Sequence, residues 1–235
     1  MLDKSRIINL VEDTICCLLS DCSNVNDIKK SFLEVIDNKE DAADKFVGAF
    51  EDIKKDLLAD LDFFMESDPA IDSKEEVILT YPGFKAICYY RIAHVLRNMG
   101  YLLISRAISE EAHSKTGIDI HPGSNIAAPF FIDHGTGIVI GETAIVGSYV
   151  KLYQSVTLGA LSLSKGAKMK NIKRHPTIGN HVTIYACASI LGDITVGDDV
   201  TIGSNVFLTE SVPSHMRVIL GKPELVFKSK EWEKQ

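Results

Sequence analysis

The sequence predicts an α+β protein in which an N-terminal α-helical domain is followed by a parallel β-helix. Two observations lead to this prediction. Apolar residues recur at helical spacing through residues 1–116. From residue 118 onward they recur instead every six residues, a short period that is typical of a stacked β-solenoid. We therefore expect a helical domain at 1–116, a β-helix at 117–223 and a short tail at 224–235.

The helical domain divides at residues that start or stop helices. Helices are expected from Ile7 to Leu19, within 24–40, from Phe46 to Phe64, from Pro82 onward and from Tyr101 to Thr116. Asp41 or Asp44 could cap the third of these. Asp68-Pro69 ends it, because the residue before a proline is disfavoured in the α region. Gly100 and Gly117 are placed to close the last two helices.

The six-residue repeat is clearest over residues 178–213. One phase of this repeat is occupied by Ile178, Ile184, Ile190, Val196, Ile202 and Leu208. Each turn can bury its apolar side chain only against its neighbours, so the turns must stack, three hexads to a coil. The phase slips by two residues between Ile138 and Ile140. Glycines after the apolar position, such as Gly141 and Gly179, are expected at sharp corners.

The repeat is interrupted between Leu158 and Ile178. Either a whole coil is replaced there, or the coil carries a protruding loop. The interrupting stretch contains no acidic residue, and its bases are Lys165, Lys168, Lys170, Lys173 and Arg174. Insertions in a solenoid project from one face, often the binding face, but a solvated surface loop would have the same composition. The sequence therefore leaves open whether this stretch is a binding segment or a solvated surface loop.

Composition excludes several other classes of protein. The chain of 235 residues has a net charge of −7 and no basic stripe, which argues against a nucleic-acid partner. No apolar run approaches the roughly 18 residues of a membrane span. The N-terminus does not read as a secretory leader. We therefore expect a cytoplasmic protein with no membrane partner.

Several motifs together resemble one family of enzymes. They are Asp68–Asp72, Gly83-Phe84, Tyr90–His94, Asp119–Pro122, Ile132–Thr143, Gln154–Gly159 and Lys173–Pro176. With the hexads, they make the chain similar to the bacterial serine O-acetyltransferases, which are hexapeptide-repeat acyltransferases. The resemblance covers about residues 66–223. It implies a left-handed coil and transfer of acetyl from acetyl-CoA to the L-serine hydroxyl, giving O-acetylserine for cysteine biosynthesis, with no metal.

The resemblance also implies roles in catalysis. A serine hydroxyl is a poor nucleophile until a base takes its proton. His134 is the expected general base, since an imidazole accepts protons readily near neutral pH. Asp119, on the adjacent turn, is expected to fix its tautomer and stabilise the imidazolium. His175 resembles the second histidine of such sites, near the reacting hydroxyl.

The resemblance also implies which residues bind the two substrates. Asp68 and Asp133 should hold the ammonium of serine, and the planar fork of Arg174 should pair with its carboxylate. Glu142 either contacts the site or pairs with a neighbouring chain. The expected contacts of acetyl-CoA are Gly159, Ala160, Ala188, Gly203, Ser204 and Lys222, with Lys165 or Lys168 as helpers for the phosphates. The family usually has a second glycine where this chain has Ala160.

Assembly and regulation follow from the same resemblance. We expect a homotrimer or a dimer of trimers, with each site between two chains. L-Cysteine shares the ammonium and carboxylate of serine and should compete with it as a feedback inhibitor. Family members that bind cysteine synthase end in isoleucine, whereas this chain ends at Gln235, so no stable complex of that kind is expected.

Other functions remain open from the sequence. A hexapeptide acyltransferase could act on the hydroxyl of a sugar or an antibiotic. His134, His175 and His181 could instead form a three-histidine zinc site between subunits, as in carbonic anhydrases built on the same coil. A non-catalytic β-helix trimer is the third alternative.

Overall fold

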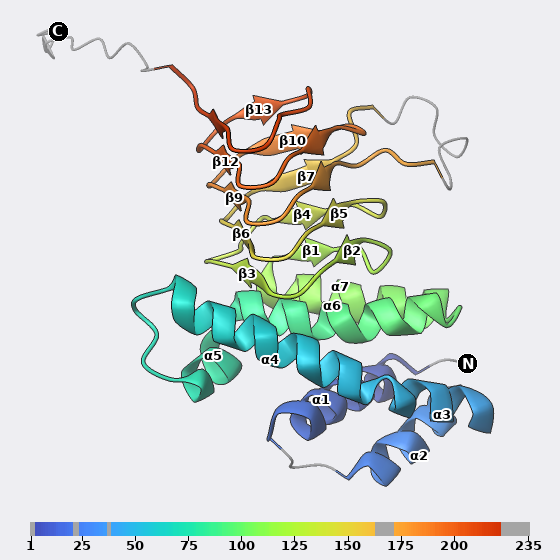
Figure 1. Cartoon of the computed structure of the whole chain (residues 1–235). Coiled ribbons are helices and arrows are strands. Elements are labelled where there is room, and N and C mark those ends of the chain that lie inside the picture. The colour runs from blue at the N-terminus through green and yellow to red at the C-terminus, as the bar shows by residue number, and fades with distance from the viewer. Residues whose placement is uncertain (1–2, 21–23, 37–38, 163–171, 222–235) are drawn as a thin grey trace, which may run out of the picture.

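The computed structural model describes residues 3–20, 24–36, 39–162 and 172–221. In these ranges, helices occupy the chain up to Thr116 and short strands follow from Asp119. Figure 1 shows the strands stacked as a column that stands on the helices. Lys222, the tail at 224–235 and the lysines at 165, 168 and 170 lie outside the described residues.

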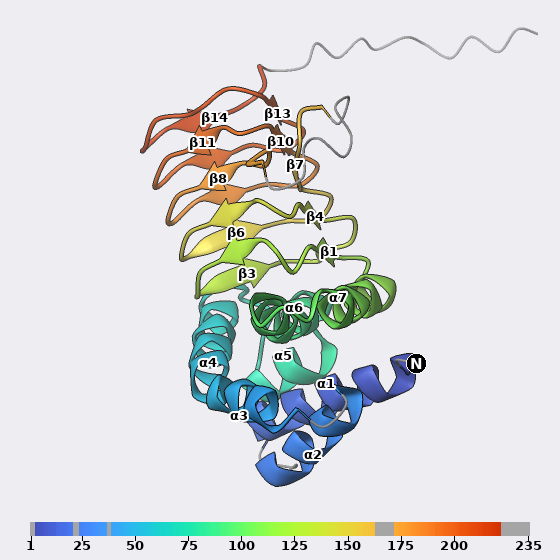
Figure 2. The ribbon, with the colours of Figure 1, turned by 90° about the vertical axis from the view of Figure 1, so that its right-hand side faces the viewer.

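The helices form two layers beneath the column (Figures 1 and 2). They are α1 (Lys4–Ser20), α2 (Val25–Val35), α3 (Glu40–Gly48), α4 (Phe50–Ser67), α5 (Lys74–Thr80), α6 (Pro82–Asn98) and α7 (Leu102–Thr116). Helices α4, α6 and α7 contact the first strands of the column, whereas α1, α2 and α3 lie farther from it. Gly117 ends α7 in the left-handed region, with φ of 71°, as the sequence predicts.

The helices differ from the sequence prediction in two places. The expected single helix ending at Phe64 is divided at Ala49, whose backbone ends α3 and begins α4. Asp44 is not a cap but lies inside α3, where its carboxylate pairs with Lys29 at 2.6 Å. Helix α5 was not predicted, although Ser73 and Glu76 are its signal: the Ser73 hydroxyl accepts a hydrogen bond from the Glu76 N–H, as in a capping box.

The strands form three parallel sheets, one for each face of a triangular prism. Face A contains β1 (Asp119–Ile120), β4 (Val139–Ile140), β7 (Thr157–Gly159), β10 (Ser189–Leu191) and β13 (Phe207–Leu208). Face B contains β2 (Asn125–Ile126), β5 (Ile145–Val146), β8 (Thr177–Ile178) and β11 (Thr195–Val196). Face C contains β3 (Phe130–Ile132), β6 (Val150–Leu152), β9 (Thr183–Ile184), β12 (Thr201–Ile202) and β14 (Arg217–Val218). The chain crosses the A–B, B–C and C–A edges in turn.

The register explains the phase slip in the sequence. Ile120 pairs with Ile140, 20 residues on, whereas Ile140 pairs with Leu158, 18 residues on. The additional residues lie in the turn Asp133–Ile138, which crosses the C–A edge after β3. The coil that contains His134 is therefore enlarged at the position of that histidine.

The register also settles the nature of the interruption. Six residues separate Ile140 from Val146 across the A–B edge, and Leu158 and Ile178 stack directly on these two residues. The 20 residues from Leu158 to Ile178 therefore cross a single edge. The insertion adds residues to one coil and does not replace a coil, and its residues 163–171 lie outside the described part of the chain.

Repeat glycines such as Gly141 and Gly179 lie at the edges of the prism, as the sequence predicts, but they do not take the left-handed conformation. Among the described residues, the left-handed corners are taken mainly by other residues, such as His181 at φ of 56° and Asn205 at 61°. Gly147 and Gly179 instead lie where successive coils approach each other. A Cβ at Gly147 would lie 2.7 Å from the Gly179 carbonyl oxygen, and one at Gly179 would lie 2.8 Å from the Asp198 nitrogen. These glycines are needed because backbone stacks on backbone at the edge.

A buried ion pair joins the helices to the column. Arg91 of α6 donates two hydrogen bonds to the carboxylate of Asp60 in α4, at 2.5 and 2.7 Å. Asp60 also accepts the N–H of Phe130 in β3 at 2.8 Å, and Arg91 donates to the Ile126 carbonyl at 3.3 Å. The pair therefore fixes α4, α6 and the first coil together. Within the described residues, no helix combines the length and apolar character needed to cross a membrane.

Candidate active site

Three of the predicted acceptor residues line one cavity at the C–A edge. Asp68, Asp133 and His134 surround a volume of about 630 Å³. The remaining lining residues are Ala70, Thr80, Tyr81, Pro82 and Thr136. Two carboxylates and an imidazole thus converge from sequence positions more than sixty residues apart. This arrangement suits a ligand that carries both a cationic group and a hydroxyl to be deprotonated.

A close backbone contact brings these residues together. Asp68 follows the end of α4 in an extended conformation, and Asp133 follows β3. Gly83, in the first turn of α6, lies so near β3 that a Cβ there would be 2.2 Å from the Ile132 carbonyl oxygen. Only glycine permits this approach without a shift of the helix. It fixes the start of α6 beside the residue that precedes Asp133.

His134 occupies the enlarged turn of the first coil. Its backbone is in the left-handed region, with φ of 55°. Its side chain is 71% exposed, so the ring is open to solvent in a single chain. Its Nδ1 lies 3.6 Å from an oxygen of Asp133. Imidazole and carboxylate therefore stand together at the mouth of the cavity, where a base must be reachable by its substrate.

Asp119 begins β1 on face A. Its carboxylate lies with Glu110 and His113 of α7, their oxygen and nitrogen atoms within 4.8 Å of one another. The Glu110 carboxylate also pairs with Arg106. The pairing of Asp119 with His134 stays a prediction.

The other predicted polar residues form a second cluster at the A–B edge. Arg174 donates to Glu142 at 2.6 Å, and Arg97 of α6 donates to the other oxygen of Glu142 at 2.6 Å. The Arg174 hydrogen bond lowers the pKa of Glu142. Within its own chain Glu142 contacts Arg174 and Arg97, and whether it also pairs with a neighbouring chain stays a prediction.

His175 has a defined hydrogen-bonding role in this cluster. Its Nδ1 accepts the backbone N–H of Thr143 at 3.1 Å, and the Thr143 hydroxyl lies 2.8 Å away. Because Nδ1 is an acceptor, the neutral ring carries its proton on Nε2. Burial, helped by the charges of Arg174 and Lys173, lowers the pKa of His175 to about 4. The ring is therefore neutral near pH 7 and offers an Nε2–H donor.

The two clusters lie on different edges of one prism. His134 stands between β3 on face C and β4 on face A, whereas His175 stands between β7 on face A and β8 on face B. The predicted acetyl-CoA residues divide in the same way. Ala188, Gly203 and Ser204 lie on the C–A edge, whereas Gly159 ends β7 on face A and Ala160 follows it at the A–B edge.

The backbone of the predicted acetyl-CoA residues is partly engaged within the chain. Ala188 is fully buried and its N–H bonds the Tyr185 carbonyl. The Gly159 carbonyl accepts the Gly192 N–H, and the Gly203 N–H bonds the Val218 carbonyl. Ser204, in contrast, is exposed.

The histidines considered for zinc are spread over three edges. His181 lies between β8 on face B and β9 on face C, where its ring stacks on Tyr149 at 4.7 Å. His134 and His175 occupy the other two edges. A single chain therefore does not bring these three rings together.

Sequence reasoning missed three residues of these clusters. Tyr81 lines the acceptor cavity, Thr143 holds His175, and Arg97 holds Glu142. Thr143 ends one of the motifs and Arg97 follows another by three residues. Only the structure shows that both contact the cluster at the A–B edge. Tyr81 directly precedes Pro82 and could be read only as a residue before a helix.

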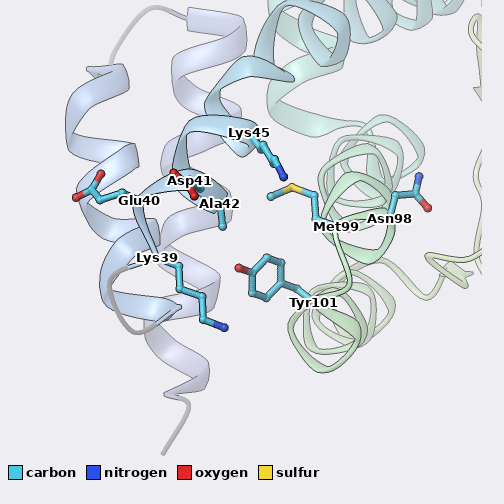
Figure 3. A pocket seen from close by; sticks show the side chains of 8 residues that line it. All are labelled: Lys39, Glu40, Asp41, Ala42, Lys45, Asn98, Met99 and Tyr101. Carbon is cyan, nitrogen blue, oxygen red and sulfur yellow. The ribbon is translucent and has the colours of Figure 1, made fainter.

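A larger hollow lies among the helices, apart from both clusters. Figure 3 shows it between α3 and the turn that leads into α7, with Lys39, Lys45, Met99 and Tyr101 around it. The remaining lining residues are Glu40, Asp41, Ala42 and Asn98. Its lining includes none of the predicted acceptor residues.

Comparison with known proteins identifies relatives by sequence. Residues 175–210 match the family model for the bacterial transferase hexapeptide (six repeats). A plasmid serine acetyltransferase of Synechococcus elongatus is 50% identical over 172 residues, covering 72% of this chain but only 54% of that protein. The serine acetyltransferase of Helicobacter pylori is 43% identical over 175 residues, covering 74% of this chain and 99% of that protein.

A solved structure extends the likeness to the helices. Serine acetyltransferase isoform 3 of Entamoeba histolytica, in complex with cysteine, aligns with a TM-score of 0.80 and 36% identity. The alignment covers 94% of this chain and 84% of that one. The predicted fold class, a helical region followed by a left-handed parallel β-helix with one protruding loop, is confirmed.

Proposed function

This chain belongs to the serine acetyltransferase family, and we propose that it transfers the acetyl group of acetyl-CoA to the hydroxyl of L-serine. The observation that carries the proposal is the cavity at the C–A edge. Asp68 and Asp133 offer two carboxylates for an ammonium group, and His134 offers a base beside them. An amino acid that bears a hydroxyl has both of the groups these residues need.

Recognition of the acceptor requires a third group. Arg174 binds the serine carboxylate through its guanidinium, and Glu142 and the backbone hold that side chain in position. A ligand bound at both ends by opposite charges can present its hydroxyl in one orientation only. The fixed orientation lowers the entropic cost of reaction.

The chemistry is a direct acetyl transfer. His134 takes the hydroxyl proton as the serine oxygen attacks the thioester carbonyl, and it returns the proton to the departing CoA sulfur. The Nε2–H of His175 donates a hydrogen bond to the oxygen on which negative charge develops. Asp119 stabilises the imidazolium of His134 during the transfer.

Acetyl-CoA supplies the activated acetyl group as the second substrate. Its pantetheine arm follows the prism edges, where Gly159, Ala160, Gly203 and Ser204 leave little side chain in its way. Ala188 shapes the C–A edge from beneath, since its own side chain is buried. Lys222 meets the phosphates of the nucleotide. The proposal needs no metal.

A complete site is formed between two chains. His134 and Arg174 lie on different edges of one prism, so the C–A edge of one chain must face the A–B edge of another. A closed ring of three chains satisfies this heterologous contact at every interface. We therefore propose a homotrimer, alone or as half of a hexamer.

L-Cysteine is the proposed feedback inhibitor. It carries the ammonium and carboxylate that Asp68, Asp133 and Arg174 recognise, with a thiol in place of the hydroxyl. The Entamoeba relative was solved with cysteine bound, which supports the proposal.

The test is CoA release from acetyl-CoA with and without L-serine, in wild type and in His134→Ala. Loss of the base should reduce serine-dependent release by roughly 10²-fold or more. His215→Ala is the matched control, because that ring is 76% exposed on the B–C edge. Release that does not depend on serine, or a His134→Ala variant as active as the control, would contradict the proposal.

A further inference from the structure

We propose that Tyr81 is a positioning residue for Asp68 and thereby determines how tightly the site holds the ammonium group of the acceptor. This inference rests on the proposed function. Tyr81 lines the same cavity as Asp68, Asp133 and His134. None of the sequence motifs assigned it a role.

The hydrogen bonds of Asp68 leave its carboxylate with one orientation. The Tyr81 hydroxyl donates to Oδ2 at 3.0 Å, and the Ala70 N–H donates to Oδ1 at 2.9 Å. An ionised carboxylate has about four acceptor positions, so each oxygen can still accept from an ammonium group. Asp68 follows the end of a helix, and these two bonds keep its side chain from rotating away.

Tyr81 is itself held through its ring and through its backbone. It meets the buried ring of Phe64 in α4 edge to face, with centroids 6.1 Å apart. Its backbone N–H ends α5 on the Val77 carbonyl, and Pro82 begins α6 directly after it. The close approach of Gly83 to β3 then fixes this segment against the strand that leads to Asp133. Tyr81 is therefore a fixed support for the Asp68 carboxylate.

The protonation state of Tyr81 suits this role. Burial, and then the hydrogen bond to Asp68, raise the pKa of Tyr81 to about 12. The phenol consequently remains a hydrogen-bond donor at and well above neutral pH.

The position of Asp68 decides which kinetic constant should change. Asp68 meets the ammonium group in both the ground state and the transition state, and the reacting hydroxyl lies elsewhere on the substrate. Removing uniform binding raises KM and leaves kcat unchanged. Tyr81→Phe deletes only the hydroxyl and keeps the contact with Phe64. We expect KM for L-serine to rise roughly three- to tenfold, since the lost bond acts through Asp68.

The experiment measures kcat and KM for Tyr81→Phe, Asp68→Asn and the double variant, with L-serine binding followed separately by calorimetry without acetyl-CoA. Asp68→Asn should raise KM at least tenfold. In that background, Tyr81→Phe should add little, because the two residues act as one unit. Tyr101→Phe is the matched control, since that tyrosine lines the distant helical hollow.

A second readout does not depend on the folded fraction. L-Glycerate keeps the carboxylate and hydroxyl of serine but lacks the ammonium group, so its inhibition constant should be the same in wild type and Tyr81→Phe. In Tyr81→Phe the inhibition constant of L-glycerate should therefore stay constant while KM for L-serine rises. The inhibition constant divided by KM should then be lower than in wild type, by the same factor by which KM rises. An equal loss for both ligands would overturn the positioning role.

Two kinds of failure are distinguishable. If wild type acetylates L-serine and Tyr81→Phe keeps its KM, the role of Tyr81 is wrong and the function stands. If wild type neither binds nor acetylates L-serine, the proposed function is wrong and the role of Tyr81 is overturned with it.

Discussion

The imidazole of His175 lies directly against the backbone of Gly141, in the space that a side chain at position 141 would need. A Cβ on Gly141 would be 2.1 Å from both Cδ2 and Nε2 of the ring. The hexad glycine at this edge therefore makes room for a functional side chain from the coil above.

Gly141→Ala should displace the His175 ring and lower kcat by roughly 10- to 100-fold, because catalytic groups tolerate little misplacement. Serine-dependent CoA release measures the effect. Gly48→Ala is the control: it lies in α3, and apart from its chain neighbours and the backbone of its own helix nothing lies within 4 Å of the added methyl. Equal activity of the two variants would mean that His175 does not act through its present position.

Mixed assemblies should test whether each site spans two chains. His134→Ala and Arg174→Ala should each be nearly inactive alone, because each lacks one cluster at every interface. Co-expressed in equal amounts, they should recover about a quarter of wild-type activity, since random mixing pairs two intact clusters at that fraction of interfaces. No recovery in a mixed trimer isolated with two affinity tags would show that one chain holds the entire site.

Acid should destabilise the protein through one buried and one partly buried histidine. Burial lowers the pKa of His121 and of His175 to about 4, below the ordinary value near ~6.5. As pH falls below the ordinary value, these histidines bind protons in the unfolded chain but stay neutral in the folded chain. Stability is therefore greatest above about pH 6.5 and declines toward pH 4.

Thermal melting at pH 7.5 and 5.0 measures this decline. His175→Gln removes one of the two groups and should reduce the drop in Tm between the two pH values. His215→Gln, which changes an exposed ring, should keep the wild-type drop. The interpretation is wrong if His175→Gln loses as much Tm in acid as wild type.

Removing the buried carboxylate of Asp60 should strongly destabilise the junction between helices and column. Asp60 is 0% exposed, and Asp60→Ala leaves the buried Arg91 guanidinium with only the half-exposed Asp56, 3.4 Å from its Nη1, as an acidic partner, which should cost about 3 kcal/mol. Asp62→Ala removes a carboxylate that is 59% exposed and paired with Lys74, and should cost at most about 1 kcal/mol. Urea unfolding of both variants compares the two free energies of unfolding.

Much of the architecture could be predicted because the hexad repeat specifies the faces. Residues such as Ile140 and Leu158 share one phase, and the structure stacks them as that phase predicts. The sequence also predicted the end of α7 at Gly117. Helix α5 and the break at Ala49 were missed because short amphipathic segments carry too few residues to establish a period.

The arrangement of the site could be predicted only in part. Asp68, Asp133 and His134 meet as expected, because two motifs of the resemblance supply them. That His134 and Arg174 lie on different edges depends on how many residues each turn contains. This count cannot be read across the insertion at 158–178 without the register. The role of Tyr81 depends on one side-chain contact, and a single tyrosine before a proline gives no signal of it.

The helices beneath the column also bear on solubility. The first coil has strands whose lower edges would otherwise offer unpaired backbone groups to any passing strand. Helices α4, α6 and α7 cover that end. An exposed strand edge is a template for aggregation, and solenoids need a terminal cap for this reason. The helical layer thus prevents columns from joining end to end into fibres. This role is separate from the placement of Asp68.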